Sequence, residues 1–288
     1  MAVFNPQQIK QLQEQAKHTR GHFSKAQLSD LQKQLDCTLE SLLKALLPVA
    51  ATFSQAPISH FNVGAVAYDK ISGNAYLGAN LEFSHQALSL VVHAEQSAIN
   101  NAWLNDAKEI SAMAITDAPC GYCRQFMNEL STAQALNIML PNLNTQLGEL
   151  LPSAFGPQEL DNSERLLASS EAKIISLSSE ISESLKLHLQ SAYAPYSKNI
   201  SAVEICTVSN GNFYGRYAEN AAYSPSLSPM QSALSQLALA GLTAKQAGIS
   251  HITLVQSEGF ENQKAVAEAV LDSYGIDLQI KHVTAKYA

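Results

Sequence analysis

Hydrophobic positions near the N-terminus follow a helical period. Leucines recur at steps of three and four residues, at Leu28, Leu31, Leu35, Leu39, Leu42 and Leu46. Side chains at this spacing share one face of an α-helix. Residues 5–45 are therefore predicted to be helical and to pack on the domain that follows.

After Pro57 the pattern changes to short apolar runs interrupted by Gly and Asn. Such runs are typical of strands, which we predict at residues 61–68, 75–78, 112–116 and 136–140. Helical patterns lie between them, at residues 93–104 and 120–130. Because strands and helices alternate, the sequence predicts an α/β layered core.

The second half of the chain repeats the first. At a nearly constant offset, Ala56-Pro57-Ile58-Ser59 matches Ala194-Pro195-Tyr196-Ser197, and Gln96-Ser97-Ala98 matches Gln231-Ser232-Ala233. Glu82 falls opposite Glu219. Shared spacing over such a distance indicates an internal duplication. We predict a helical segment at 1–45, a first core at 46–150, a connector with a functional loop at 151–180, and a second core at 181–288.

Composition narrows the possible partners. The chain has 288 residues, of which 46% are hydrophobic and 15% charged, and its net charge is −7. No apolar run approaches the roughly 20 residues that span a bilayer, so no membrane partner is expected. The N-terminus lacks the apolar stretch of a secretory signal, which favours a cytoplasmic location. Lys and Arg are scattered, so no nucleic-acid partner is expected.

A C-x-x-C pair supplies the candidate metal chemistry. Cys120 and Cys123 lie one helical turn apart, and Pro119 favours a helix start beside them. A helix N-terminus stabilises the thiolates that bind metals. With His93 they make three ligands, and catalytic zinc sites keep three protein ligands and an open position for water. We predict one Zn²⁺ per chain at His93, Cys120 and Cys123.

Glu95 stands two residues after His93. Such residues lie about 200° apart around a helix, but they can converge at its first turn. We therefore place the helix start at His93, with its imidazole on the metal and the Glu95 carboxylate beside the attacking water, as catalytic acid and base. The C-x-x-C pair alone leaves a structural zinc site or a redox pair open, whereas H-A-E followed by P-C-x-x-C is the signature of zinc deaminases.

These motifs resemble those of the cytidine deaminase family, in particular its longer two-domain form. The similarity covers nearly the whole chain and rests on Phe61-Asn62-Val63-Gly64-Ala65, Gly78-Ala79-Asn80-Leu81-Glu82, His93-Ala94-Glu95-Gln96, Pro119-Cys120-Gly121-Tyr122-Cys123-Arg124-Gln125 and Ala154-Phe155-Gly156-Pro157. It implies a duplicated three-layer α-β-α core, a mixed sheet with helices on both faces, after an N-terminal helical extension. It also implies hydrolysis of cytidine and deoxycytidine to uridine, deoxyuridine and ammonia, in pyrimidine salvage.

Five residues are candidates for substrate contacts. Asn80 and Glu82 stand at i and i+2 of a strand end, so both side chains point to one side, where they suit a sugar hydroxyl. A polar strand end in a turn is the alternative. The resemblance assigns this pair to the ribose 3′-hydroxyl, Phe61 to stacking on the base, and Phe155 to a loop that closes over the pyrimidine. It places Ala94 among the substrate contacts.

Two further positions depend on the same resemblance. It places Ala65 and Glu95 where they read the exocyclic amine and the carbonyl of the base. Tyr122 departs from the pattern, because close relatives often carry His inside the C-x-x-C. Since this is not a ligand position, the metal site is expected to survive, with altered hydrogen bonds around it.

The second half lacks the metal ligands. Ser228-Pro229-Met230 stand opposite His93-Ala94-Glu95, and no cysteine follows Leu254. The resemblance therefore implies a homodimer in which this inert domain mimics the four-subunit arrangement of shorter relatives. In that arrangement Ala222 and Tyr223 reach the substrate of the partner chain.

Other functions stay open at this point. Deamination of a nucleotide or polynucleotide requires cations or a glycine-rich amide nest for phosphate, neither of which is evident in this acidic chain. A non-catalytic nucleoside-binding or regulatory module has no need of Glu95 beside a metal. A structural zinc domain would unfold on chelation rather than merely lose activity.

Overall fold

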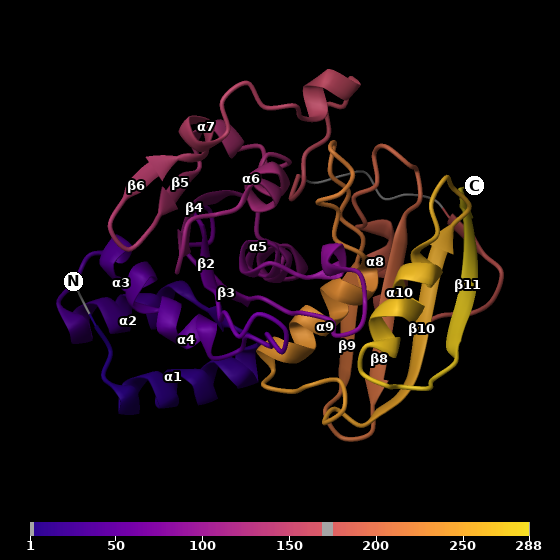
Figure 1. Ribbon diagram of the computed structural model, residues 1–288, viewed down its shortest axis with the longest axis horizontal. Coiled ribbons are helices and arrows are strands. Elements are labelled where there is room, and N and C mark those ends of the chain that lie inside the picture. Colours follow the sequence, from indigo (N-terminus) through magenta and orange to yellow (C-terminus); the bar gives the residue numbers. More distant parts are fainter. Residues whose placement is uncertain (1–2, 169–174, 288) are drawn as a thin grey trace.

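The computed structural model describes residues 3–168 and 175–287. Figure 1 shows the two halves of the chain side by side, with helices α5 (Ala94–Leu104) and α9 (Pro229–Leu239) between them. Each half contains one mixed sheet with helices on its faces. The predicted α/β class and duplicated layered core are confirmed.

The first sheet has six strands in the order β1-β3-β2-β4-β5-β6. Only β4 and β5 run parallel; the other neighbours are antiparallel. The four predicted strands are all present, with ends shifted by a few residues. The strands are β1 (His22–Phe23), β2 (Gly64–Asp69), β3 (Ala75–Ala79), β4 (Ile110–Ile115), β5 (Asn137–Met139) and β6 (Asn144–Gln146).

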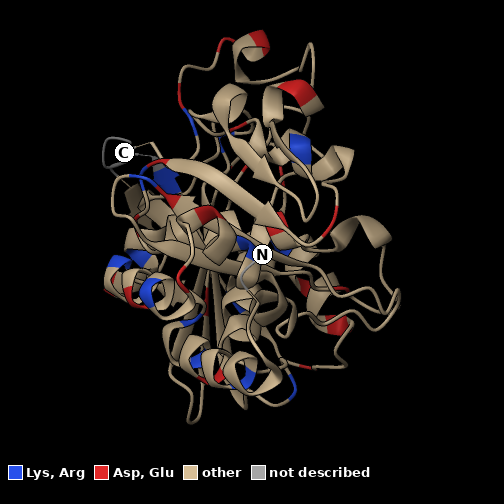
Figure 2. Cartoon of the chain, turned by 90° about the vertical axis from the view of Figure 1, so that its left-hand side faces the viewer, with Lys and Arg blue, Asp and Glu red and all other residues tan. Residues whose placement is uncertain are grey.

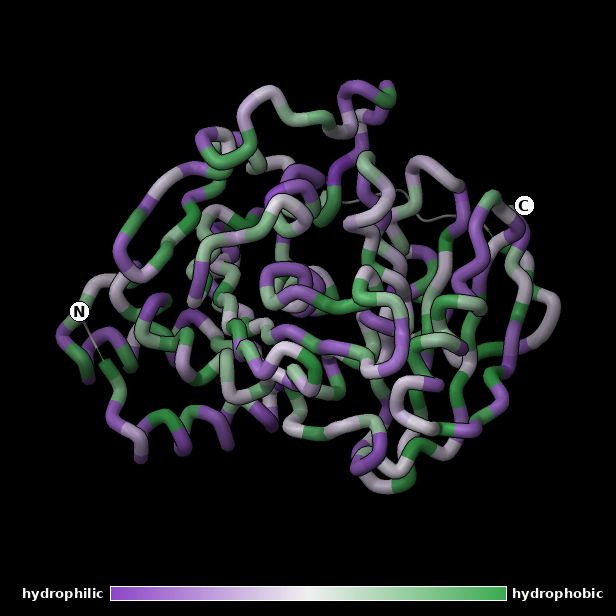
Figure 3. Tube along the Cα trace, in the orientation of Figure 1, coloured by the Kyte–Doolittle hydropathy of each residue, from purple (hydrophilic) through white to green (hydrophobic). Residues whose placement is uncertain are grey.

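Helices from the N-terminal segment cover one face of this sheet. They are α1 (Pro6–Thr19), α2 (Lys25–Leu35), α3 (Leu39–Ala45) and α4 (Leu47–Ala51). Figure 3 shows hydrophobic and hydrophilic positions alternating along α1, and Leu28, Leu42 and Leu46 are buried in one cluster with Val66 and Leu77 of the sheet. The predicted packing of this segment on the first domain is confirmed.

The helical prediction for residues 5–45 missed two interruptions. Helix α1 ends at Arg20 and α2 at Asp36, and both residues adopt a left-handed backbone with φ of 51° and 48°. Asn5 and Ser24 cap the two helices through capping boxes, and Thr38 caps α3. These local stop and start signals turn one periodic stretch into separate helices.

The opposite face of the first sheet carries α5 and α6 (Gly121–Met127), together with α9 of the second half. Helix α6 ends at Met127, three residues before the end of the helix predicted at residues 120–130. Three-residue 3₁₀ helices and one short α-helix lie in the surrounding loops: Leu88–Leu90, Ala133–Ala135 and α7 (Leu147–Leu150).

The second sheet has five strands in the order β7-β11-β10-β8-β9. Helix α8 (Glu183–Gln190) lies on one face, while α9 and α10 (Gln263–Asp272) pack on the other. Strands β10 and β11 are parallel, as β4 and β5 are. The strands are β7 (Ile175–Leu177), β8 (Ser201–Thr207), β9 (Asn212–Arg216), β10 (Ile249–Ser257) and β11 (Ile280–Tyr287).

The two halves share one hydrophobic cluster and a buried polar seam. Apolar side chains of α5, α9 and both sheets belong to a single buried cluster. Within it, the Ser97 and Ser235 hydroxyl oxygens lie 2.7 Å apart, and the Ser232 hydroxyl donates to Asn100 Oδ1 at 2.6 Å. Because buried polar groups need partners, these hydrogen bonds fix how α5 sits against α9.

The connector contains more regular structure than predicted. A 3₁₀ helix occupies Pro157–Leu160, and β7 pairs antiparallel with β11, so part of the stretch 151–180 belongs to the second sheet. Residues 169–174 of this stretch lie outside the described residues. The exact domain limits remain a prediction. In the described ranges, every helix is too short or too polar to cross a lipid bilayer.

Candidate metal centre

The start of α5 positions the first candidate ligand. His93 is the N-cap, with an extended backbone (φ −81°, ψ 155°), and its N–H donates to Gln96 Oε1 at 3.1 Å. The side chain of an N-cap residue projects from the helix end rather than from its lateral face. The helix start predicted at His93 is confirmed, and it aims the imidazole past the first turn.

The start of α6 positions the two thiols. Cys120 is the N-cap of this helix, and its sulfur accepts from the Cys123 N–H at 3.5 Å. Cys120 is exposed and Cys123 is buried. Both sulfurs therefore lie at a helix N-terminus, where unpaired N–H groups stabilise negative charge.

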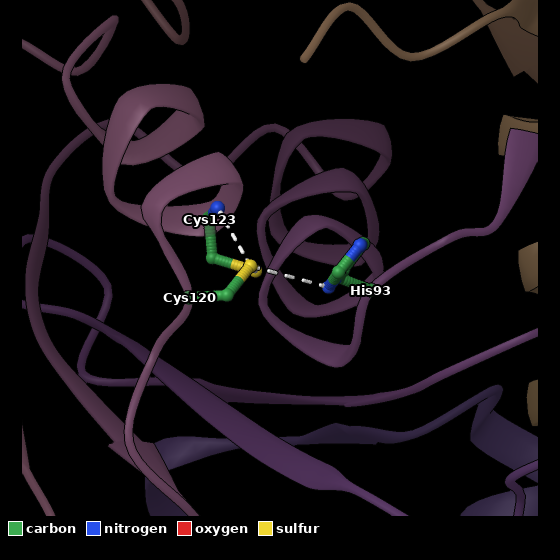
Figure 4. A group of neighbouring side chains, drawn as sticks. All are labelled: His93, Cys120 and Cys123. Atoms are coloured by element: carbon green, nitrogen blue, oxygen red, sulfur yellow. Dashed lines mark hydrogen bonds between the residues drawn. The ribbon is translucent and has the colours of Figure 1, made fainter. Parts of the chain in front are cut away.

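The three side chains converge, as Figure 4 shows. Their candidate ligand atoms all lie within 4.8 Å of one another. Cys120 Sγ lies 3.7 Å from His93 Nδ1 and 3.4 Å from Cys123 Sγ. Tetrahedral zinc with ordinary bond lengths requires separations of about 3.6 Å and 3.8 Å, so the residues present fit this metal. Zinc also prefers this thiolate and imidazole donor set.

The charge state of the cluster already favours metal binding. A hydrogen bond from Cys123, followed in importance by the neighbouring His93, lowers the pKa of Cys120 to about 3, against the opposing effect of burial. Burial lowers the pKa of His93, but the hydrogen bond and charge of Cys120 outweigh it and leave that pKa raised. The lowered pKa favours the thiolate form of Cys120, which is the form that binds a metal.

Glu95 lies beside these ligands in the first turn of α5. Its side chain is 4% exposed, and burial raises the pKa of its carboxyl. A raised pKa makes it easier for this carboxyl to accept a proton, as a general base must. The position of Glu95 next to the cluster agrees with the place predicted for it.

Tyr122, the residue inside the C-x-x-C that departs from the family pattern, contacts both His93 and the second half of the chain. Its ring stacks on His93, with ring centroids 5.1 Å apart and an interplanar angle of 23°. Its hydroxyl donates to the carbonyl of Ser224, in the second half of the chain. The tyrosine thus braces the imidazole and ties it to a distant loop, which the sequence alone did not indicate.

Asn80 and Glu82 are brought together after β3, at the loop of residues 54–63. Glu82 accepts the Ile58 N–H at 2.8 Å, the Ser59 N–H at 2.9 Å and the Ser59 hydroxyl. Burial raises the pKa of this carboxyl, but these hydrogen bonds outweigh it and lower the pKa, so Glu82 is ionised. These hydrogen bonds hold the Glu82 carboxylate in place against the loop. The same carboxylate is the candidate acceptor for a substrate hydroxyl.

Asn80 is also used within this loop. Its Oδ1 accepts from Ser54 and Val63, at 2.6 and 2.9 Å, and its Nδ2 donates to the Phe61 carbonyl at 3.0 Å. An amide nitrogen has two N–H groups, so one remains for another acceptor. Asn80 therefore holds Phe61 in place whether or not it also contacts a substrate.

The remaining candidates of the first half have different degrees of exposure. Phe61 is 55% exposed and Phe155 47% exposed, which is unusual for side chains with only a core role. The Phe155 carbonyl accepts from Gln125 and Asn128, at 2.6 and 3.2 Å, so its loop is tied to α6. Ala94 and Ala65 are buried.

Ala222 and Tyr223 lie on a loop of the second half that packs beside α6 of the same chain. Ala222 is exposed, and Tyr223 is 68% exposed with a left-handed backbone at φ 61°. The adjacent Ala221 N–H donates to the carboxylate of Glu129 at 2.7 Å, and Asn220 donates to the Gln125 carbonyl at 2.8 Å. The loop is therefore anchored to α6 and its C-terminal end in its own chain.

Glu129 is a buried carboxyl at the end of α6 that no sequence motif indicated. It is fully buried and also accepts from the hydroxyls of Tyr193 and Tyr196, at 2.7 and 3.0 Å. Burial raises the pKa of its carboxyl. No local pattern marked it, because its three partners come from a distant part of the sequence.

The second half repeats the helix start that positions His93, but it lacks the metal ligands. Ser228 caps α9 in the place of His93, and its N–H donates to Gln231 as the His93 N–H donates to Gln96. Within the described residues, the group of His93, Cys120 and Cys123 is the one cluster of this kind that could hold a metal. On the face drawn in Figure 2, basic and acidic residues are interspersed along the helices.

Comparison with protein families gives two matches, one in each half. Both family models are described as "Cytidine and deoxycytidylate deaminase zinc-binding region", and they match residues 38–139 and 147–268. The first match contains all three candidate ligands and Glu95. The second covers the half without them, in agreement with the duplication.

Curated relatives match most of the chain. A protein named cytidine deaminase from Actinobacillus pleuropneumoniae is 41% identical over 260 residues, which are 89% of this chain and 86% of the relative. One of that name from Shewanella loihica is 47% identical over 221 residues, covering 76% and 74%. Among solved structures, cytidine deaminase from Mycobacterium tuberculosis is 30% identical, with a TM-score of 0.37, and covers 40% of this chain and 96% of its own.

Proposed function

Because the chain belongs to the cytidine deaminase family, we propose that it hydrolyses cytidine and deoxycytidine to uridine and deoxyuridine, with release of ammonia. The observation that carries this proposal is the convergence of His93, Cys120 and Cys123 beside the buried Glu95. The reaction belongs to pyrimidine salvage, since it acts on free nucleosides.

Each residue of the centre has a proposed role. His93, Cys120 and Cys123 hold one zinc ion per chain. Bound zinc supplies a Lewis acid that makes water nucleophilic at neutral pH. The Glu95 carboxylate takes a proton from the attacking water and delivers it to the ring nitrogen. It then takes the second proton from the hydroxyl that has added to the ring carbon and passes it to the amine, which leaves as ammonia while the carbonyl forms. Tyr122 keeps the His93 ring oriented through the stack described above.

The sugar end of the site is built on the loop that Glu82 and Asn80 stabilise. The ionised Glu82 has lone pairs left for a 3′-hydroxyl, and Asn80 retains one free N–H. Phe61 offers an exposed ring for stacking on the base, and Phe155 is held close to α6 to cover it. Ala94, at the first position of α5, supplies backbone contacts.

An assay on cytidine with zinc quantified in the same preparation tests this function. The unmodified chain should contain about one zinc per chain and release ammonia. Glu95→Gln should retain the zinc and lose activity by at least about 100-fold, because it removes only the proton transfer. A chain that binds zinc but deaminates no nucleoside would instead be a binding or regulatory module.

The substrate class is tested by comparing cytidine, CMP and a single-stranded oligonucleotide. We expect a strong preference for cytidine, because the Glu82 carboxylate at the sugar end disfavours a phosphate. Faster turnover of CMP or of the oligonucleotide would transfer the proposal to nucleotide or polynucleotide deamination.

We further propose that the chain works as a homodimer, in which Ala222 and Tyr223 reach the substrate of the partner chain. The 68% exposed ring of Tyr223 supports this, and the hydrogen bonds of Asn220 and Ala221 hold its loop in a fixed position on the chain. A contact of Tyr223 with the substrate of its own chain is the alternative. A mixed dimer distinguishes the two. When a Glu95→Gln chain is paired with a Tyr223→Ala chain, a contact across the dimer leaves one intact site, whereas a contact within the chain leaves none.

The proposed layout assigns catalysis to residues 46–150 and a non-catalytic role to residues 181–288. The helices of residues 1–45 complete the layer beneath the catalytic sheet. A cytoplasmic location is part of the proposal, because a reducing compartment keeps Cys120 and Cys123 available as metal ligands.

A further inference from the structure

A cavity of about 400 Å³ lies in the second half of the chain. Aromatic side chains and two carboxylates face it. Its lining includes Tyr196, Tyr217, Tyr223, Phe260, Glu219 and Glu261. A concave site of this size, with flat apolar walls and a few polar groups, has the character of a small-molecule site.

One end of this cavity repeats the sugar end of the first half. Glu219 accepts the N–H groups of Tyr196 and Ser197, at 2.7 and 3.1 Å, and the Ser197 hydroxyl. Glu82 accepts the same three donors from Ile58 and Ser59. The second half therefore retains the same hydrogen-bonded carboxylate, although it lacks the three metal ligands.

The other end differs where the first half carries its metal. Thr116 and Ser257 occupy matching positions, since each donates its N–H to the carbonyl at the start of the neighbouring strand, at 3.0 and 2.8 Å. Cys120 and Glu261 follow four residues later. A carboxylate therefore stands where the first half has a thiolate. It accepts a hydrogen bond from Tyr217, and Tyr217 faces the cavity.

Phe260 contributes a further aromatic wall. Its ring lines the cavity and is 97% exposed. An occupant of the cavity can therefore bury a large apolar surface against this ring without displacing its present contacts.

We propose that this cavity is a second nucleoside site, which binds an amino-substituted pyrimidine nucleoside without converting it. Glu219 accepts the sugar hydroxyl, and this assignment rests on the sugar role proposed for Glu82. The base lies among the aromatic walls, and its exocyclic amine donates to Glu261. A carbonyl in place of that amine meets the carboxylate with like partial charge, so the site discriminates against uridine. Two carboxylates disfavour a 5′-phosphate.

Equilibrium dialysis with labelled cytidine tests the proposal on the zinc-loaded Glu95→Gln chain, which should deaminate the ligand at least about 100-fold more slowly than the unmodified chain. We expect two cytidine molecules per chain. Adding Glu219→Gln should leave the first site unchanged and weaken cytidine binding at the second at least tenfold, because an amide replaces the carboxyl group that accepts the sugar hydroxyl. Adding Glu82→Gln, the matched change in the first half, should remove the other site instead. Uridine should compete at one site only.

Two outcomes overturn the proposal. One is a single cytidine per Glu95→Gln chain that disappears with Glu82→Gln and is indifferent to Glu219→Gln. The other is a second site that survives both Glu219→Gln and Phe260→Ala, since it must then lie elsewhere. Phe260→Ala guards against misfolding, because an almost fully exposed side chain can be removed at little cost to stability. Deamination by the unmodified chain is scored separately, so failure of the second site leaves the proposed function standing.

Discussion

Replacing Gly78 by alanine should separate helix α5, whose N-cap is His93, from strand β3, which leads to Asn80 and Glu82. A Cβ atom at Gly78 of β3 would lie 2.1 Å from the Ala98 nitrogen and 2.3 Å from the Ala94 carbonyl oxygen of α5. Both are backbone atoms of a regular helix, so neither can rotate away. Gly78→Ala can be accommodated only if α5 and β3 move apart.

The size of this movement follows from the distances. An ordinary contact begins at 3.4 Å, so α5 must retreat by about 1.3 Å, the difference between 3.4 and 2.1 Å. Overpacking of this kind costs about 3 kcal/mol, which corresponds to a fall in Tm of about 5 °C for a chain of this size. Because α5 carries His93 and Glu95 while β3 leads to Asn80, a misplacement of about 1 Å should lower kcat/KM by roughly 100-fold.

The duplication provides a matched control. A Cβ atom at Gly215 of β9 would lie 2.1 Å from the Pro229 carbonyl oxygen and 2.4 Å from the Ala233 nitrogen of α9. Gly215→Ala should therefore lower Tm as much as Gly78→Ala does. Its effect on kcat/KM should stay below about tenfold, because α9 carries no candidate ligand.

Thermal unfolding followed by circular dichroism and the cytidine assay at 25 °C check this pair. The reasoning is refuted if Gly78→Ala keeps kcat/KM within about threefold of the unmodified chain. It is refuted equally if Gly215→Ala, at the same loss of Tm, lowers kcat/KM as much as Gly78→Ala. In either case the spacing of α5 and β3 would not control the centre.

Two further predictions concern buried ionisable groups of the second half and its junction with the first. Glu129→Ala leaves three donors without their acceptor and should lower the free energy of unfolding by about 3 kcal/mol, whereas Glu129→Gln keeps an acceptor and should lose less than half of that in urea titrations. An equal loss in both variants would contradict this account. Burial, aided by Arg216, lowers the pKa of His188 to about 4. The unfolded chain then binds more protons, so stability falls as pH drops from about 6.5 towards 4, by up to about 3 kcal/mol. His188→Phe, which preserves the stack on Tyr214, should flatten Tm over that range, and an unchanged pH profile would exclude His188 as the cause.

Local sequence signals located the helix starts that matter most. His93 and Cys120 are both N-caps, as the motifs around them predict, and this aims two of the three candidate ligands away from helical side faces. The C-terminal ends of the helices were harder to predict from the sequence. Helix α6 stops at Met127, and the N-terminal periodicity continued through two left-handed caps at Arg20 and Asp36 that a pattern of leucines does not register.

Contacts between distant segments could not be read from any local pattern. The stack of Tyr122 on His93 is local, but its anchor at Ser224 comes from the other half of the chain. Glu129 is a single carboxylate in the sequence, and only folding surrounds it with donors from Tyr193 and Ala221. Pairing of β7 with β11 likewise depends on tertiary packing, because three residues carry too little periodicity to predict a strand.

The sequence by itself predicted the chemistry of the centre: which residues can bind zinc, which carboxylate is the candidate for proton transfer, and which half lacks both. These follow from residue types and short spacings, because a helix start places neighbouring side chains in a known geometry. Only the tertiary structure decided how the two halves meet, through the seam of α5 and α9, and that a cavity persists in the second half. Such features arise from contacts across more than a hundred residues, whose register is set by packing rather than by local preference.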